Sequence, residues 1–297
     1  MPGISNTFHV QGFVFSFSNS FNIYVAYKMS KLAAFEAGFM ELDERIITRA
    51  IVEEFTNVFL DYTDVDVALV GGGPANLVAA RYLAEAGLKT VLFEKKLSVG
   101  GGMWGGGMMF PRIVVQEEAR RILDDFDVPY HEYEEGYYVA NSVGTVGKLI
   151  SAAVSAGVEI FNLVSFEDVM IRDKDEVCGL VINWTAVEIG RLHVDPLTIR
   201  SRLVLDGTGH EATVCNTVQR KIPGAFGGKG VVGEKPMWAD TGERLVMENT
   251  REVYPGLIVT GMAANAVAGS PRMGPVFGGM LLSGEKAAQL AISRLKD

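Results

Sequence analysis

The sequence has few of the residues that build disulfide frameworks and cysteine-rich metal sites. Its 297 residues include two cysteines, Cys178 and Cys215. Two cysteines allow one disulfide at most and cannot supply a cysteine-rich zinc site. Histidine is equally scarce, so any imidazole chemistry is restricted to His9, His131, His193 and His210.

Basic residues and long apolar runs are also in short supply. The chain has 27 Lys and Arg against 36 Asp and Glu, a formal net charge of −9. A broad nucleic-acid surface needs a basic face, so we expect no nucleic-acid partner. A membrane span needs roughly 20 mostly apolar residues, and no stretch supplies them, so we expect no membrane partner either.

The first 40 residues differ in character from the rest. No Lys or Arg precedes Lys28, and polar residues interrupt the aromatic stretch 10–27. A secretory signal needs a positive start and a clean apolar core, so a cytoplasmic protein is expected. We predict a poorly ordered extension over 1–40. Two alternatives stay open: an accessory strand or interface arm, and a natural start at Met29 or Met40.

What is present is an alternation of strand-like and helix-like segments. Helices are expected over residues 41–55, 75–86, 115–126, 143–156 and 280–295. Strands are expected over residues 66–70, 90–93, 159–171, 176–184, 202–206 and 257–259. Such alternation predicts an α/β protein with a parallel central sheet. We expect one catalytic domain over 41–297, a Rossmann-like FAD/NAD-binding fold with inserted smaller β elements.

A glycine-rich turn joins the first of these strands to its helix. The segment VGGGPAN spans residues 70–76, and Glu94 ends the next strand. Glycines at such a turn let backbone N–H groups approach a pyrophosphate, and the acid accepts hydrogen bonds from ribose hydroxyls. The combination predicts dinucleotide binding; a tight turn without a ligand is the alternative. Asn76 departs from the pattern, which has Gly or Ala there.

Two further features describe the expected ligand. Residues 100–107 contain six glycines in eight positions, which favours a loop beside the ligand over a mobile surface loop. Later, Met262 follows Gly261, where FAD enzymes of this shape carry an acidic residue. The sequence therefore favours a ligand with an ADP-ribose part and no flavin.

From residue 41 onward, the chain resembles the archaeal branch of the thiamine thiazole synthase family. The motifs that carry the resemblance are ELDERIITRAI from residue 41, GGGPA from 71, FEKK from 93, GGGMWGGGMMF from 100, LHVDP from 192, DGTGHEA from 206 and GMAANAVAGSPRMGPVFGGMLLSGEKAA from 261. The resemblance implies an enzyme that uses NAD as a substrate and expels nicotinamide. It then condenses the ADP-ribose with glycine and adds sulfur, giving an adenylated thiazole carboxylate.

The resemblance also implies a metal, Fe(II), held by Asp195 and His210. A carboxylate and an imidazole suit divalent iron with open positions. Family members are homo-oligomers, octamers in the family pattern, with sites shared between protomers, so one ligand is expected from a neighbouring copy. Without the resemblance, Asp195 could be a turn residue and His210 a helix cap.

The source of sulfur follows from one position. Where the fungal and plant branch has a cysteine that gives up its own sulfur, this chain has His193. Cys178 and Cys215 stand elsewhere, and both are expected to be small buried residues. We therefore expect free sulfide as the donor and multiple turnovers. An imidazole at position 193 could serve as an acid or base, because its pKa lies near working pH.

The remaining roles come from the same resemblance. Arg272 is expected to bind the glycine carboxylate through a bidentate fork, with a surface salt bridge as the alternative. The residues expected to bind the nucleotide are Gly71, Gly73, Ala75, Glu94, Lys95, Gly102, Val164, His193, Val194 and Met262. Ala75 replaces a serine common in the family, which removes one possible phosphate hydrogen bond.

Two competing functions remain at this point. The first is an FAD-dependent oxidoreductase of the geranylgeranyl-reductase-like type, which would carry a bound flavin. The second is a nucleotide-sensing protein that binds NAD without releasing nicotinamide. The expected enzyme differs from both because it consumes NAD together with glycine and sulfide.

Overall fold

A computed structural model describes residues 8–10, 13–15, 40, 42–172, 175–228 and 230–296. The chain divides into two units, Met1–Val58 and Phe59–Asp297, and each is described by itself. The expectation of a poorly ordered extension over residues 1–40 falls almost entirely outside the described residues, so it stays a prediction.

The described residues of the first unit form two short strands and most of one helix. Strands β1 (Phe8–Val10) and β2 (Phe13–Phe15) form an antiparallel pair. The helix expected over residues 41–55 is α2 (Glu44–Asp61), which begins later and continues into the second unit. The Asp43 carboxylate accepts a hydrogen bond from the Arg45 backbone N–H at 2.9 Å, as a residue at a helix start does.

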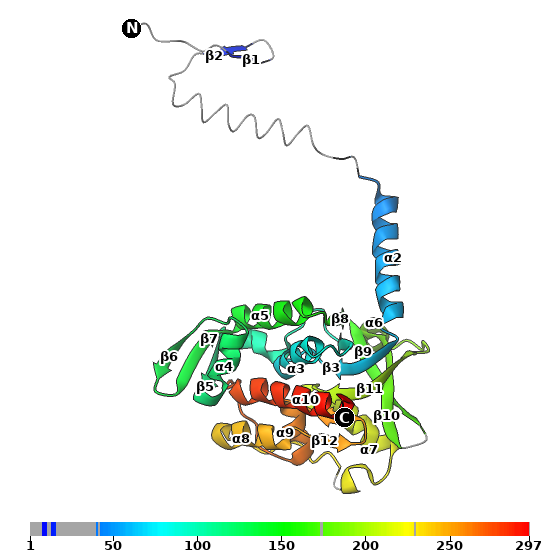
Figure 1. Ribbon diagram of the computed structural model, residues 1–297, viewed down its shortest axis with the longest axis vertical. Coiled ribbons are helices and arrows are strands. Elements are labelled where there is room, and N and C mark those ends of the chain that lie inside the picture. The colour runs from blue at the N-terminus through cyan, green and yellow to red at the C-terminus, as the bar shows by residue number, and fades with distance from the viewer. Residues whose placement is uncertain are drawn as a thin grey trace. The chain divides into compact units, whose positions relative to one another are not determined.

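A mostly parallel sheet forms the centre of the second unit (Figure 1). Its order is β12-β13-β11-β3-β4-β8, with β10 pairing β11 and β9 pairing β10. The strands are β3 (Asp64–Val70), β4 (Thr90–Glu94), β8 (Glu159–Asn162), β9 (Val164–Arg172), β10 (Glu176–Trp184), β11 (Leu197–Asp206), β12 (Glu252–Tyr254) and β13 (Leu257–Val259). Pairing is parallel from β13 through β11, β3 and β4 to β8, which confirms the expected fold class.

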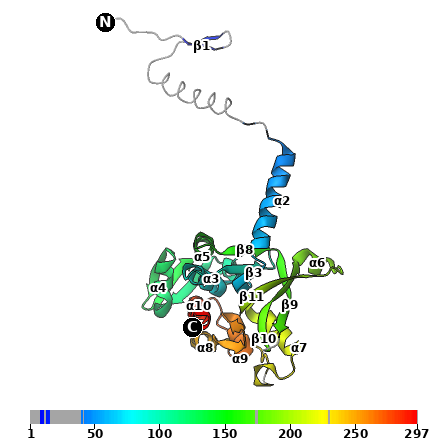
Figure 2. The same ribbon diagram turned by 45° about the vertical axis from the view of Figure 1, so that its right-hand side comes forward.

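Helices pack on this sheet because their apolar residues match those of the buried strands. Helix α3 (Pro74–Glu85) buries most of its length, with Leu77, Val78 and Leu83 fully enclosed. It lies beside α10 (Gly278–Lys296), which Figures 1 and 2 both show. The remaining α-helices of the unit are α4 (Glu117–Asp125), α5 (Ser142–Ser155), α6 (Thr185–Gly190), α7 (Thr213–Lys221), α8 (Ala239–Asn249) and α9 (Met262–Ala268).

The inserted β elements lie at opposite ends of the second unit (Figure 2). One is the three-stranded sheet of β5 (Arg112–Gln116), β7 (Tyr137–Asn141) and β6 (Tyr130–Glu134); the other is the antiparallel pair β9–β10. Short 3-10 turns η1 (Gly101–Gly105), η2 (Gly209–Glu211) and η3 (Ala225–Gly228) complete the unit.

Two expected elements differ from the structure. Residues 115 and 116 belong to β5 rather than to a helix, because alternating Ile113 and Val115 are buried against the core. The single strand expected over 159–171 is two strands, β8 and β9. Leu163 separates them with a φ of +58°, a left-handed conformation that interrupts a strand. No helix among the described residues is long and apolar enough to cross a bilayer.

Candidate active site

Three backbone segments from distant parts of the sequence meet at the carboxyl ends of β3 and β11. Gly71 has a φ of +90°, and a Cβ placed there would come within 2.7 Å of the Gly207 carbonyl oxygen. A Cβ on Gly101, with φ +59°, would come within 3.2 Å of the Gly73 Cα. Glycine is therefore required at this turn for its backbone angle and for close approach.

Asn76, which stands where the glycine pattern has Gly or Ala, stabilises this turn through its side chain. Its side chain is fully buried and donates to the Val70 carbonyl at 3.0 Å and the Gly71 carbonyl at 2.8 Å. The space it needs is left by Gly207, where a Cβ would come within 2.4 Å of the Asn76 amide. A side chain at position 76 is thus accommodated because a glycine on the neighbouring loop makes room for it.

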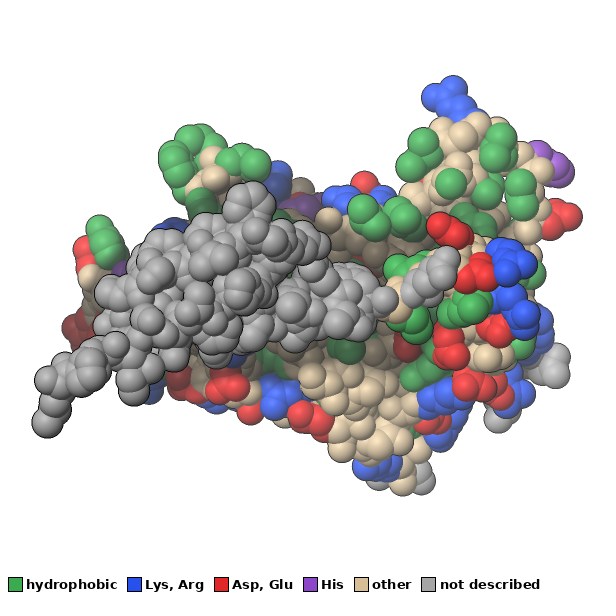
Figure 3. Space-filling model, turned by 90° about the horizontal axis from the view of Figure 1, so that it is seen from above, with side chains coloured by type: hydrophobic (Ala, Val, Ile, Leu, Met, Phe, Trp, Pro, Cys, Tyr) green, Lys and Arg blue, Asp and Glu red, His purple; other side chains and the backbone are tan. Residues whose placement is uncertain are grey.

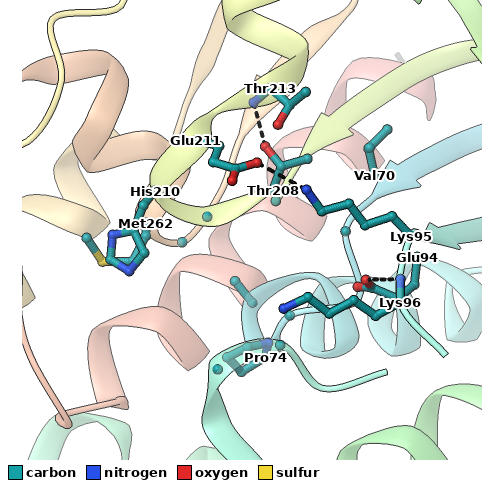
Figure 4. A pocket seen from close by; sticks show the side chains of 18 of the residues that line it. Val70, Pro74, Glu94, Lys95, Lys96, Thr208, His210, Glu211, Thr213 and Met262 are labelled. Atoms are coloured by element: carbon teal, nitrogen blue, oxygen red, sulfur yellow. Dashed lines mark hydrogen bonds and ion pairs between the residues drawn. The ribbon is translucent and has the colours of Figure 1, made fainter. Parts of the chain in front are cut away.

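Glu94 is the last residue of β4, and its carboxylate forms hydrogen bonds with the glycine-rich turn and with the loop that follows β4. One carboxylate oxygen accepts from the Gly72 backbone N–H at 2.7 Å. The other accepts from the Lys96 N–H at 2.8 Å (Figure 4). The residue is 6% exposed. Each carboxylate oxygen can accept a second hydrogen bond, so these backbone contacts leave capacity for a ligand hydroxyl.

A cavity of about 990 Å³ opens beside this turn. The N-terminus of α3 faces it through Gly73 and Pro74, and the glycine loop lines another part of it. Across the cavity mouth, the Lys95 ammonium lies 3.2 Å from the Glu211 carboxylate (Figure 4). Exposed N–H groups at a helix start favour an anionic ligand.

Asp206 organises the loop that follows β11. The residue is fully buried, and its carboxylate accepts from the Thr208 backbone N–H at 3.0 Å and the Thr208 hydroxyl at 2.7 Å. Its other oxygen accepts from the Cys215 backbone N–H at 3.0 Å. These bonds close the turn that presents His210 to the cavity.

The two cysteines differ in their surroundings. Cys215 is buried as expected, and burial, with the Asp206 carboxylate close by, raises the pKa of its thiol. Cys178 is only partly buried, and its thiol contacts the Met170 carbonyl at 3.5 Å. A thiol with a raised pKa is a weak nucleophile, because the thiolate is the reactive form.

His210 contacts a carboxylate that lies behind it. Its Nδ1 atom lies 2.7 Å and 2.8 Å from the two carboxylate oxygens of Glu234, whose side chain is only 11% exposed. Glu234 also lies 3.7 Å from the Nε atom of Arg272. One carboxylate therefore contacts both the imidazole and the guanidinium that the sequence singled out.

The structure brings most of the expected site residues to one cavity. Those that line it are Gly71, Gly73, Ala75, Glu94, Lys95, Gly102, Val164, His210, Met262 and Arg272. Those that do not are His193, Val194 and Asp195, which are all exposed. The loop 192–196 therefore reaches the cavity at its first residue only, since Leu192 is part of the lining.

No complete metal site forms within the part of the chain that the structure describes. No group of three or more His, Cys, Asp or Glu side chains there could hold a metal ion. The two expected metal ligands also do not share the cavity, since His210 lines it and Asp195 does not. A metal at His210 therefore needs ligands from elsewhere.

Two residues of this site went unmarked in the sequence. Asp206 ends a predicted strand just before a Gly-Thr-Gly turn, a position from which an acid can cap the following turn. Glu234 has no such signal, because its contacts to His210 and Arg272 arise only when distant segments pack together.

Comparison with known proteins identifies relatives over most of the chain. The model of the Thi4 family matches residues 48–277. Thiamine thiazole synthase from Methanococcoides burtonii is 76% identical over 257 residues, covering 86% of this chain and 100% of that protein. Thiamine thiazole synthase from Pyrococcus abyssi is 54% identical over 254 residues, covering 86% and 99%.

A solved structure agrees with these relatives. The crystal structure of Thermovibrio ammonificans THI4 matches with a TM-score of 0.84 and 49% sequence identity. The match covers 87% of this chain and 100% of that one. The resemblance drawn from the motifs is therefore confirmed over the fold as well as the sequence.

Proposed function

The chain belongs to the Thi4 family and is an enzyme of thiamine thiazole biosynthesis, and we propose that it makes an adenylated thiazole carboxylate from NAD, glycine and free sulfide. The reaction releases nicotinamide, needs Fe(II) and runs for multiple turnovers. NAD is a substrate here, and its ADP-ribose part remains in the product.

The nucleotide end of the cavity supports NAD as the ligand. The backbone at Gly71 and Gly73 and the start of α3 offer N–H groups to a pyrophosphate. Glu94 retains acceptor capacity for ribose hydroxyls. Met262 lies at the cavity wall where an acid would accompany a flavin, which favours a ligand without one.

Iron would be held by His210 together with Asp195. His210 suits this role because its Nδ1 contacts Glu234, which leaves Nε2 free to bind a metal from the cavity side. Bound Fe(II) would supply a Lewis acid with open positions for sulfide. Asp195 lies outside the cavity lining of its own chain, so we propose that Asp195 of a second copy completes the site.

Exposed apolar side chains support a homo-oligomer. Around Asp195, the residues Ile189, Leu192, Val194 and Leu197 are each at least half exposed. Hydrophobic side chains also stand out between the charged groups on the face in Figure 3. Several exposed apolar side chains close together in sequence favour a protein partner, and a second copy would both cover them and deliver Asp195.

Glycine and sulfide have separate places in this scheme. Arg272 lines the cavity and would hold the glycine carboxylate through its NH1 and NH2 groups. His193 would move protons during enolisation and dehydration once a second copy brings its loop to the cavity. Neither cysteine is suited to donate sulfur: Cys215 is buried with a raised thiol pKa, and neither cysteine lines the cavity.

The observation that carries the proposal is the cavity that joins a phosphate-binding turn to His210 and Arg272. The test is an anaerobic incubation of the protein with NAD, glycine, sulfide and Fe(II), followed by mass spectrometry. An adenylated thiazole in molar excess over protein is expected. No product with all four components present would overturn the proposal.

The same samples separate the two competing functions. An FAD oxidoreductase would show a flavin band near ~450 nm in the purified protein, because the cofactor carries that chemistry. A nucleotide sensor would bind NAD and release no nicotinamide. We expect no flavin band, and release of one nicotinamide for each thiazole formed.

A further inference from the structure

We propose that Glu234 is a positioning residue that orients His210 for metal binding and Arg272 for substrate binding. The inference rests on the proposed function, which gives those two side chains their roles. Glu234 contacts both of them, yet it does not line the cavity. It therefore acts through its neighbours and does not touch the reacting groups.

The contacts of Glu234 are close and largely shielded from water. His210 Nδ1 lies 2.7 Å and 2.8 Å from its two oxygens, and Arg272 Nε lies 3.7 Å from one of them. The Glu234 side chain is 11% exposed, whereas His210 and Arg272 are 54% and 59% exposed. The carboxylate is thus the buried member of the group, and the two cavity side chains are the exposed ones.

The backbone around Glu234 is held by hydrogen bonds. Gly233 N–H donates to the Ala266 carbonyl at 2.9 Å, and Lys235 N–H donates to the Ser270 carbonyl at 3.1 Å. Arg272 N–H donates back to the Lys235 carbonyl at 3.3 Å. The segment carrying Glu234 is therefore bonded on both sides to the segment that carries Arg272.

For His210, this contact decides which ring nitrogen faces the cavity. An ionised carboxylate only accepts hydrogen bonds, so Nδ1 must carry the proton in this pair. The lone pair then lies on Nε2, the nitrogen available to a metal. Ligating histidines commonly donate their other ring N–H to a carboxylate, which fixes the tautomer and the ring orientation.

For Arg272, the same carboxylate is placed at Nε. A carboxylate held there leaves the terminal NH1 and NH2 groups to form a fork toward the cavity. The Arg272 Nε atom lies 3.7 Å from the carboxylate, whereas His210 Nδ1 lies within 2.8 Å of both oxygens, so the orienting effect on Arg272 is smaller than on His210. Loss of Glu234 should therefore affect metal binding strongly and substrate binding weakly.

The test compares Glu234→Ala, which removes acceptor and charge, with Glu234→Gln, which keeps an acceptor and removes the charge. Glu285→Gln is the matched control, since Glu285 is also a largely shielded carboxylate paired with an arginine, Arg121, away from the cavity. Three quantities are measured: the His210 tautomer in metal-free protein, the Kd for Co(II), and the KM for glycine.

Solid-state ¹⁵N NMR of histidine-labelled protein reads the tautomer, with His210→Gln identifying the signal. We expect the Nδ1–H form in the unaltered protein and in Glu234→Gln, and a mixture in Glu234→Ala. The Co(II) Kd should rise ~10- to 100-fold in Glu234→Ala and stay near the unaltered value in Glu234→Gln. The glycine KM should rise about threefold in both variants, because both lose the charge beside Arg272.

Each contrary result has a distinct meaning. An Nε2–H form in the unaltered protein, or no tautomer change in Glu234→Ala, would overturn the role of Glu234. Equal Co(II) affinity across all variants would do the same. If the unaltered protein binds no Co(II), the iron of the proposed function is wrong, and the tautomer measurement alone decides the role of Glu234.

Discussion

The two ends of the expected site are built in opposite ways. At the nucleotide end, Asn76 and Glu94 are buried and Gly71 is half-buried, and their hydrogen bonds run to the backbone of the same chain. At the other end, the loop 192–196 presents His193 and Asp195 to solvent, away from the cavity lining. The residues expected at the first end therefore lie together within one chain, and those expected at the other end do not.

This difference separates the proposed nucleotide binding at the first end from the proposed proton transfer and metal binding at the second. In the proposed function a single chain would hold the dinucleotide, because the residues proposed for phosphate and ribose come from one sheet edge. The groups assigned to proton transfer and metal binding are brought together only if a second copy supplies loop 192–196. Assembly would then control catalysis without being needed for the nucleotide pocket.

The largest effect is expected from two inactive variants, each altered at one of the two proposed metal ligands. Asp195→Ala and His210→Ala should each lower activity by at least ~10²-fold, because each would remove one of the two proposed metal ligands. Co-expressed with different tags and purified through both, the mixed oligomer should regain about a quarter of the activity if sites form between random pairs of chains. Thiazole formation per protomer is the measurement.

The mixture also distinguishes the alternatives for Asp195. If both ligands came from the same chain, every site in the mixture would lack one ligand and no activity would return. The control is a mixture in which both chains carry Asp195→Ala, which should stay inactive. A mixed oligomer as inactive as this control would refute the shared site.

The nucleotide end is tested by replacing one glycine of the turn with alanine, which adds a methyl group. Gly71→Ala should lower the free energy of unfolding by about 2–3 kcal/mol, because it combines a left-handed φ with a clash against the Gly207 carbonyl. The NAD affinity should fall at least about tenfold, since the backbone at this turn lines the cavity and is proposed to bind the pyrophosphate. Chemical unfolding and calorimetric titration with NAD measure the two effects.

Gly87→Ala is the matched control for this substitution. Gly87 also has a positive φ, +80°, but nothing lies within 4 Å of a Cβ placed there. It should lose about 1 kcal/mol from backbone conformation alone and keep its NAD affinity. If both variants lost the same stability and neither lost affinity, the close approach of the loops would have no role in binding.

Local sequence patterns were sufficient for the parallel core. One local pattern consists of the apolar run 66–70, the glycines that follow it and Glu94. It depends only on residues close together in the sequence, and β3, α3 and β4 lie where it predicts them. The expected helix includes the last two residues of β5, because Val115 fits either period at the junction with α4. The interruption at Leu163 depends on a backbone angle that leucine rarely adopts, so composition could not reveal it.

The site residues likewise divide into those that local sequence patterns predict and those that they do not. The glycine turn and its acid follow a spacing rule, so residues 70–76 and Glu94 could be read from the sequence. The fit of Asn76 against Gly207 and the contact of Glu234 with His210 depend on packing between segments far apart in the chain. Such contacts have no periodicity, and for that reason Glu234 was missed.

The smallest expected effect concerns a buried carboxylate near the cavity. Glu243 accepts from the Gly279 backbone N–H at the start of α10 and from the Gln116 amide at 2.9 Å, while its other oxygen has no hydrogen-bond partner among the described residues. Burial raises its pKa above the ordinary 4.5. The folded protein therefore holds this proton more tightly than the unfolded chain does.

The sign of the pH effect follows from that raised pKa. The proton's contribution to stability is fully present below pH 4.5 and is lost as pH rises through the raised value. Glu243→Gln carries no charge at any pH, so it should be more stable than the original by about 1 kcal/mol at pH 7 and no more stable at pH 4. Denaturant unfolding at both pH values measures this, with exposed Glu135→Gln as the control. A pH-independent difference would show that the pKa of Glu243 is the same in the folded and the unfolded protein, and that the enclosed character of the nucleotide end does not extend to the start of α10.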